Sequence, residues 1–147
     1  MSSPPTGTVT FLFTDIEGST KLWERSPEAM QRALVCHDKV PQKVIEAHGG
    51  YVFKTVGDAF CAAFAAATHA LEAALETQRA LLEEEWEVTG PLRVRMALHT
   101  GAAEERGGDY FGPPVNRVAR LLSAGHGGQV LLSLATQELV RDELPEG

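Results

Sequence analysis

Cysteine is scarce in this sequence of 147 residues, which contains only Cys36 and Cys61 and no CxxC pair. That scarcity excludes a disulfide framework and a cysteine-based zinc site. The two residues are typical of thiols in a reducing compartment, and we expect both to be buried. The five histidines are scattered without metal-ligand spacing, so they predict no metal centre either.

Long apolar runs and an excess of basic charge are also lacking. No window approaches the length of a membrane-spanning segment, and residues 1–7 have neither the apolar nor the basic region of a signal peptide. We therefore expect a flexible N-terminal arm, no membrane partner and a cytoplasmic location. The net charge of −7 argues against a nucleic-acid partner, which would need a basic face. A small anionic ligand stays compatible with this charge, because metal ions can mediate its binding.

What the chain does contain is the composition of one globular domain, with 44% hydrophobic and 22% charged residues. Apolar periodicity and turn residues predict alternating strands and helices. The first four strands and two long helices follow a βαββαβ order, which indicates an α+β fold with a ferredoxin-like sheet and its helices on one face. A helix, a strand and a helix follow as a C-terminal appendage. The predicted strands are 8–14, 51–56, 59–64, 92–100 and 129–133; the predicted helices are 19–24, 27–48, 66–87, 113–124 and 134–141; residues 101–108 are predicted to form a polar loop.

The stretch VTFLFTDIEGSTKLW, residues 9–23, places one carboxylate directly after the first predicted strand. Asp15 is there either a functional acid at a strand end or a cap for the helix that follows. Asp58 lies in the Gly57-Asp58 turn between the second and third strands, and alone it would be read as a turn residue. In a ferredoxin-like sheet the first and third strands are antiparallel neighbours, so the two carboxylates should meet. Such a pair suits Mg²⁺ or Mn²⁺ ions.

The helix after Pro114 carries a second set of candidate residues. Asn116 and Arg120 are four residues apart and therefore share a face of that helix. An amide and a guanidinium together suit a phosphate or a developing negative charge, although a solvated helix face is the alternative. Lys54 in the second strand and Asp109 before the helix are further candidates, each with a simple surface reading when taken alone.

Three segments together resemble the class III nucleotidyl cyclases, the catalytic domains of adenylyl and guanylyl cyclases. They are FTDIEGST (13–20), FKTVGDAF (53–60) and DYFGPPVNRVARL (109–121), and the resemblance extends from about residue 8 onward. It implies two metal ions, Mg²⁺ or Mn²⁺, held by Asp15, Asp58 and the Ile16 carbonyl. It implies that Lys54 and Asp109 read the purine, and that Asn116 and Arg120 position the ribose and stabilise the transition state.

The resemblance also implies a homodimer, because in this family the metal-binding group and the other four residues come from different subunits. Lys54 as donor and Asp109 as acceptor complement the edge of adenine, which favours ATP over GTP. The expected reaction is conversion of ATP to 3′,5′-cyclic AMP and pyrophosphate. The alternatives are a guanylyl cyclase and a non-catalytic nucleotide-sensing or dimerisation module. Family domains continue into further strands, so we expect residues 8–147 to lack these strands and a regulatory domain to follow in a longer protein.

Overall fold

The computed structural model describes residues 4–83 and 93–141. The end of the helix predicted at 66–87 and the break predicted at Gly90-Pro91 lie outside the described residues. In chain order the elements are β1 (Thr8–Ile16), α1 (Ser19–Arg25), α2 (Pro27–Ala47), β2 (Tyr51–Val56), β3 (Ala59–Phe64), α3 (Ala67–Glu83), β4 (Val94–Ala102), β5 (Glu104–Arg106), β6 (Asp109–Phe111), α4 (Pro113–Ser123), β7 (Val130–Leu132) and α5 (Leu134–Val140).

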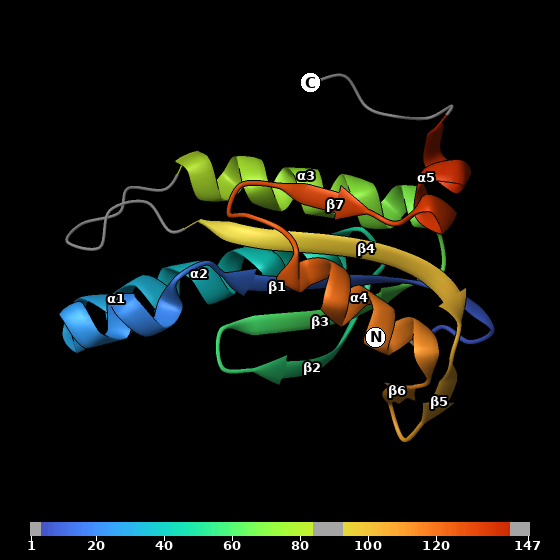
Figure 1. Cartoon of the computed structure of the whole chain (residues 1–147), viewed down its shortest axis with the longest axis horizontal. Helices are drawn as coiled ribbons and strands as arrows, with labels where there is room; N and C mark the ends of the chain where they lie inside the picture. Colours follow the sequence, from blue (N-terminus) through green and yellow to red (C-terminus); the bar gives the residue numbers. More distant parts are fainter. Residues whose placement is uncertain (1–3, 84–92, 142–147) are drawn as a thin grey trace.

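The main sheet has five strands in the order β2-β3-β1-β4-β7 (Figure 1). β1 is antiparallel to both β3 and β4, and β7 adds to β4 in parallel. The order of the first four strands is that of a ferredoxin-like sheet, so the predicted α+β class is confirmed. Thr14 at the end of β1 lies opposite Phe60 at the start of β3, as the antiparallel arrangement required.

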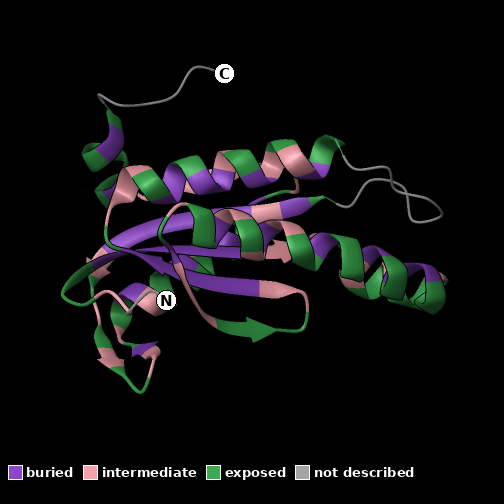
Figure 2. Cartoon of the chain, turned by 180° about the vertical axis from the view of Figure 1, so that it is seen from behind, coloured by how far each residue is buried: buried purple, intermediate pink, exposed green. Residues whose placement is uncertain are grey.

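Alternate residues of the strands supply two separate hydrophobic cores. Leu12, Phe64 and Met96 face the layer formed by α2 and α3, which covers one side of the sheet (Figure 2). Phe11, Phe13 and residues of α4 form the second core on the opposite side, and α4 lies in front of the sheet in Figure 1. The sheet is therefore buried on both faces at its centre, and seven of the nine residues of β1 are buried.

Three sequence-based expectations are wrong in detail. β1 continues to Ile16, so Asp15 belongs to the strand and does not follow it. The polar loop predicted at 101–108 instead contains the end of β4, all of β5 and the turn into β6. Cys36 is exposed, because the buried face of α2 carries Ala33 and His37 on either side of it; Cys61 is buried as expected.

The helices of the described residues include none that is both long and apolar enough to cross a membrane. The residues before β1 that the structure describes, 4–7, form neither a helix nor a strand.

Candidate active site

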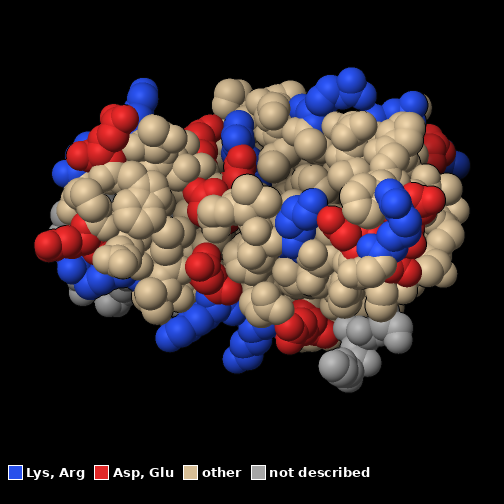
Figure 3. Space-filling model, turned by 90° about the horizontal axis from the view of Figure 1, so that it is seen from below, with Lys and Arg blue, Asp and Glu red and all other residues tan. Residues whose placement is uncertain are grey.

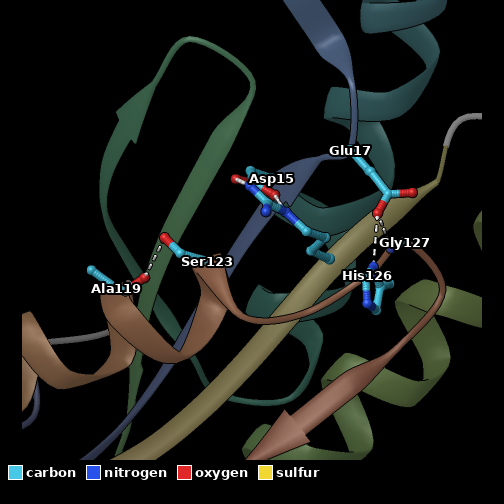
Figure 4. Close-up of polar contacts among 7 residues, drawn as sticks. Asp15, Glu17, Ala119, Ser123, His126 and Gly127 are labelled. Carbon is cyan, nitrogen blue, oxygen red and sulfur yellow. Dashed lines mark hydrogen bonds and ion pairs between the residues drawn. The ribbon is translucent and has the colours of Figure 1, made fainter.

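Asp15 lies on the sheet face opposite α2 and α3 and is paired with an arginine on the neighbouring strand. In the antiparallel register Asp15 stands directly across from Arg95 of β4. The Arg95 Nε donates to Asp15 Oδ1 over 2.7 Å, and a second guanidinium nitrogen donates to Oδ2 (Figure 4). This hydrogen bonding raises the pKa of Arg95 above its ordinary value. The helix-cap reading of Asp15 is wrong, because the N-cap of α1 is Gly18.

Asp58 follows Gly57 in the two-residue turn between β2 and β3. Gly57 has a φ of +59°, a conformation that glycine adopts readily. Burial raises the pKa of Asp58, a Ser19 hydrogen bond opposes this, and the nearby charge of Asp15 raises it further. The two carboxylates are thus close enough to interact electrostatically. Asp58 Oδ2 is buried and has no hydrogen-bond partner among the described residues.

A buried carboxylate oxygen that has no hydrogen-bond partner is suited to bind a cation. Asp58 Oδ2, the Asp15 carboxylate and the Ile16 carbonyl are hard oxygen donors of the kind that Mg²⁺ and Mn²⁺ take. Residues 4–83 and 93–141 contain no cluster of three or more His, Cys, Asp or Glu side chains that could hold an ion.

Lys54 and Asp109, remote in the sequence, meet on the same face of the sheet. Their Nζ and Oδ2 atoms are 3.2 Å apart. A β-bulge at Phe53 makes this possible, because the register passes from Val52↔Ala62 directly to Lys54↔Cys61. Without the extra residue, Lys54 would stand across from Phe60, whose ring lies near His37 of α2 on the other face. The bulge therefore aims the lysine at Asp109.

Asn116 and Arg120 are both exposed on α4. The opposite face of this helix packs on the sheet through Pro114, Val118 and Leu122. Val118 and Leu122 are buried, whereas Ala119 is exposed. The structure thus presents the amide and the guanidinium outward. Seen from below the sheet, acidic and basic side chains are interspersed with uncharged surface (Figure 3).

Two contacts of the site were missed from sequence. Arg95 alternates with buried Val94 and Met96, and the antiparallel register of β1 and β4 was the signal that could have placed it beside Asp15. The second is Glu17, whose carboxylate accepts from the Gly127 backbone N–H over 3.1 Å and lies 3.6 Å from His126 Nδ1 (Figure 4). Glu17 thereby joins the loop after the Asp15 strand to the loop after α4.

Comparison with known proteins identifies the family. A model described as the adenylate and guanylate cyclase catalytic domain matches residues 1–146. The chain belongs to this family.

The cyclase domain is 46% identical over 144 residues to an uncharacterized protein of Mycobacterium tuberculosis, a match that covers 97% of this chain and 48% of that protein. It is 39% identical over 156 residues to the adenylate cyclase of Lachancea kluyveri, covering 89% of this chain and 8% of the fungal protein. A solved structure of an adenylate cyclase from Trypanosoma brucei, described as monomeric, superposes with a TM-score of 0.88 at 31% identity and covers 93% of this chain and 78% of that one. The cyclase domain thus spans about half the length of the mycobacterial relative and a small part of the fungal one.

Proposed function

We propose that this cyclase domain is an adenylate cyclase, which converts ATP to 3′,5′-cyclic AMP and pyrophosphate at the interface of a homodimer. The observation that carries the proposal is the Lys54–Asp109 pair, 3.2 Å apart on the same sheet face as Asp15. An ammonium donor beside a carboxylate acceptor complements the N1 acceptor and 6-amino donor of adenine. Guanine presents the reverse pattern there, so it would leave mismatched polar groups in a closed site.

The metal-binding part of the site would consist of Asp15, Asp58 and the Ile16 carbonyl. Two Mg²⁺ or Mn²⁺ ions bound there would lower the pKa of the attacking ribose 3′-hydroxyl and neutralise the triphosphate. Asp58 favours such binding because its buried Oδ2 has no hydrogen-bond partner in the described part of the chain.

The remaining groups would act from the partner subunit. Asn116 and Arg120 are exposed on α4, where they can reach a nucleotide held by another copy of the chain. Asn116 would orient the ribose, and Arg120 would meet the charge that develops at the α-phosphate. The Trypanosoma brucei relative is described as monomeric, so its cyclase fold forms without a partner subunit.

The test is to incubate the purified protein with Mn²⁺ and either ATP or GTP, and to measure cyclic nucleotide and pyrophosphate. We expect cyclic AMP from ATP, little product from GTP, and no product from Asp58→Ala. Preferred use of GTP would identify a guanylyl cyclase and refute the assigned roles of Lys54 and Asp109. Nucleotide binding without turnover by dimeric protein would refute the enzyme and favour a nucleotide-sensing module.

A further inference from the structure

Asp109 lies on a short strand whose own hydrogen bonds are too few to fix its position. It is the first residue of β6, which pairs only with β5 in a separate two-stranded sheet of three-residue strands. An isolated two-stranded hairpin is marginally stable in water. Base recognition requires the Asp109 carboxylate to stay within roughly 0.5 Å of its working position. Side-chain packing on the main sheet must therefore supply the rigidity that this hairpin lacks.

Tyr110 provides that packing. It is 2% exposed, whereas every other residue of β5 and β6 is half-buried or exposed. Its ring meets those of Phe53 and Phe11 edge-on, with centroids 4.8 Å and 5.3 Å away. Phe53 immediately precedes Lys54, and Tyr110 immediately follows Asp109. Each of the two residues proposed to contact the base is therefore next in sequence to one member of the packed Phe53–Tyr110 pair. The Tyr110 backbone N–H also donates to Asp109 Oδ1 over 2.7 Å.

The hydroxyl of Tyr110 reaches beyond this aromatic pair to the start of the chain. It donates a 2.6 Å hydrogen bond to the carbonyl oxygen of Pro5. This bond joins the described segment before β1, residues 4–7, to the β5–β6 hairpin. Pro4 and Pro5 restrict the backbone there, which helps to present the acceptor in a fixed direction. Burial raises the pKa of Tyr110 to about 12, so the hydroxyl remains a donor at neutral pH.

We propose that Tyr110 is a positioning residue for base selection, and that the N-terminal segment at Pro5 is part of the purine site. The Tyr110–Pro5 hydrogen bond fixes the ring that carries Asp109 and so maintains the geometry that favours adenine over guanine. The segment before β1 thereby acts on specificity without touching the nucleotide. This inference rests on the proposed cyclase function.

The test compares Tyr110→Phe with the wild type, because this change removes the hydroxyl and keeps the ring. Loss of one buried hydrogen bond predicts an increase in KM for ATP of about three- to tenfold, with kcat within about twofold. The ATP-over-GTP ratio of kcat/KM should fall by a similar factor. Tyr51→Phe is the matched control, since the Tyr51 hydroxyl lies against Gly108 of the same hairpin. It should leave the ratio unchanged.

A second variant addresses the other end of the bond. Pro5→Gly keeps the carbonyl but frees the backbone that presents it, so it should shift the ATP-over-GTP ratio in the same direction as Tyr110→Phe. The two changes disrupt one contact, and the double variant should therefore be no worse than Tyr110→Phe alone.

An unchanged ATP-over-GTP ratio in Tyr110→Phe, with active wild type, would overturn the inference and leave the proposed function intact. A lower melting temperature with that ratio unchanged would make Tyr110 a purely structural residue and would also overturn it. Wild-type protein without cyclase activity would refute the proposed function itself, so the two failures are distinguishable.

Discussion

At the scale of single residues, Asp15 and Arg95 form an ion pair with two hydrogen bonds. Both side chains are mostly covered, with 20% and 25% of their surfaces exposed. Removing one member of such a pair leaves a charge that is poorly solvated. The guanidinium also occupies both oxygens of a carboxylate that we propose binds a metal ion, so it should compete with that ion.

Arg95→Met is therefore expected to lower the stability of the metal-free protein by about 1–3 kcal/mol. Added Mn²⁺ should raise the melting temperature of this variant more than that of the wild type, because the ion then meets no competing guanidinium. Thermal melts with and without Mn²⁺ measure both effects. Arg106→Met is the control, since Arg106 pairs with Glu104 on an exposed surface and should matter little. An equal Mn²⁺ shift in variant and wild type would contradict the competition.

His99 makes a second residue-scale prediction, on pH dependence. Its Nδ1 is 2.7 Å from Ser133 Oγ, its Nε2 is buried without a partner in the described part of the chain, and burial, assisted by Arg117, lowers its pKa. A lowered folded-state pKa means that the unfolded chain binds the proton more tightly. Stability linked to His99 is thus complete above about pH 6.5 and is lost as the pH falls below that value.

His99→Asn keeps a polar atom near the Nδ1 position and cannot be protonated. Urea unfolding above and below about pH 6.5 should show a smaller acid-induced loss of stability in this variant than in the wild type. His69→Asn, at an exposed histidine of α3, should retain the wild-type pH profile. Identical profiles for all three proteins would show that His99 is not the responsible group.

At the scale of elements, the loop between α4 and β7 is held between β4 and the end of β1. A Cβ at Gly127 would come within 2.3 Å of Arg93 Cβ, and its N–H bonds to Glu17. Gly127→Ala should therefore destabilise the protein by about 1–3 kcal/mol in urea unfolding, because the close approach leaves no room for a methyl group. Ser123→Ala removes a hydrogen bond to Ala119 at the exposed end of α4 and should cost much less (Figure 4). Equal stabilities would mean that the loop can move away from β4.

The individual strands also show which parts of the fold can be predicted from sequence patterns. Strands 51–56 and 59–64 were predicted with the bounds that the structure has, since apolar runs flank a Gly-Asp turn. The bulge at Phe53 was not predictable, because the packing of its ring on Tyr110 and Phe11 creates it. β5 was predicted as part of a polar loop, since its three residues are all charged and none of them is buried.

The candidate site likewise contains one contact that strand order predicts and one that it does not. The meeting of Asp15 and Asp58 followed from strand order alone, because a ferredoxin-like sheet makes β1 and β3 neighbours. The Lys54–Asp109 contact could be expected only from resemblance to a family, since it depends on a bulge and on a hairpin outside the main sheet. That these four residues bind metal and purine remains a prediction.

At the scale of the whole molecule, the two faces of the main sheet carry different groups of residues. α2 and α3 bury one face, and the other carries Asp15, the Lys54–Asp109 pair and α4. If each subunit of a homodimer lends its base-reading and α4 residues to the metal site of the other, every dimer contains two equivalent composite sites. A subunit with a defective metal-binding group and a subunit with a defective base-reading or α4 group can then form one intact site between them.

Asp15→Ala and Arg120→Ala should each be inactive as homodimers, since every composite site then lacks one essential group. Mixed in equal amounts with subunit exchange, they form heterodimers in which one site is built from two intact halves. Statistical mixing makes half of the dimers heterodimers with one working site of two, so cyclic AMP production should recover to about one quarter of the wild-type rate. Asp15→Ala mixed with Asp58→Ala is the matched control: both changes damage the metal-binding half, so that mixture must stay inactive. Failure of the first mixture to recover activity, with heterodimers detected, would place Asp15 and Arg120 in a site within one chain.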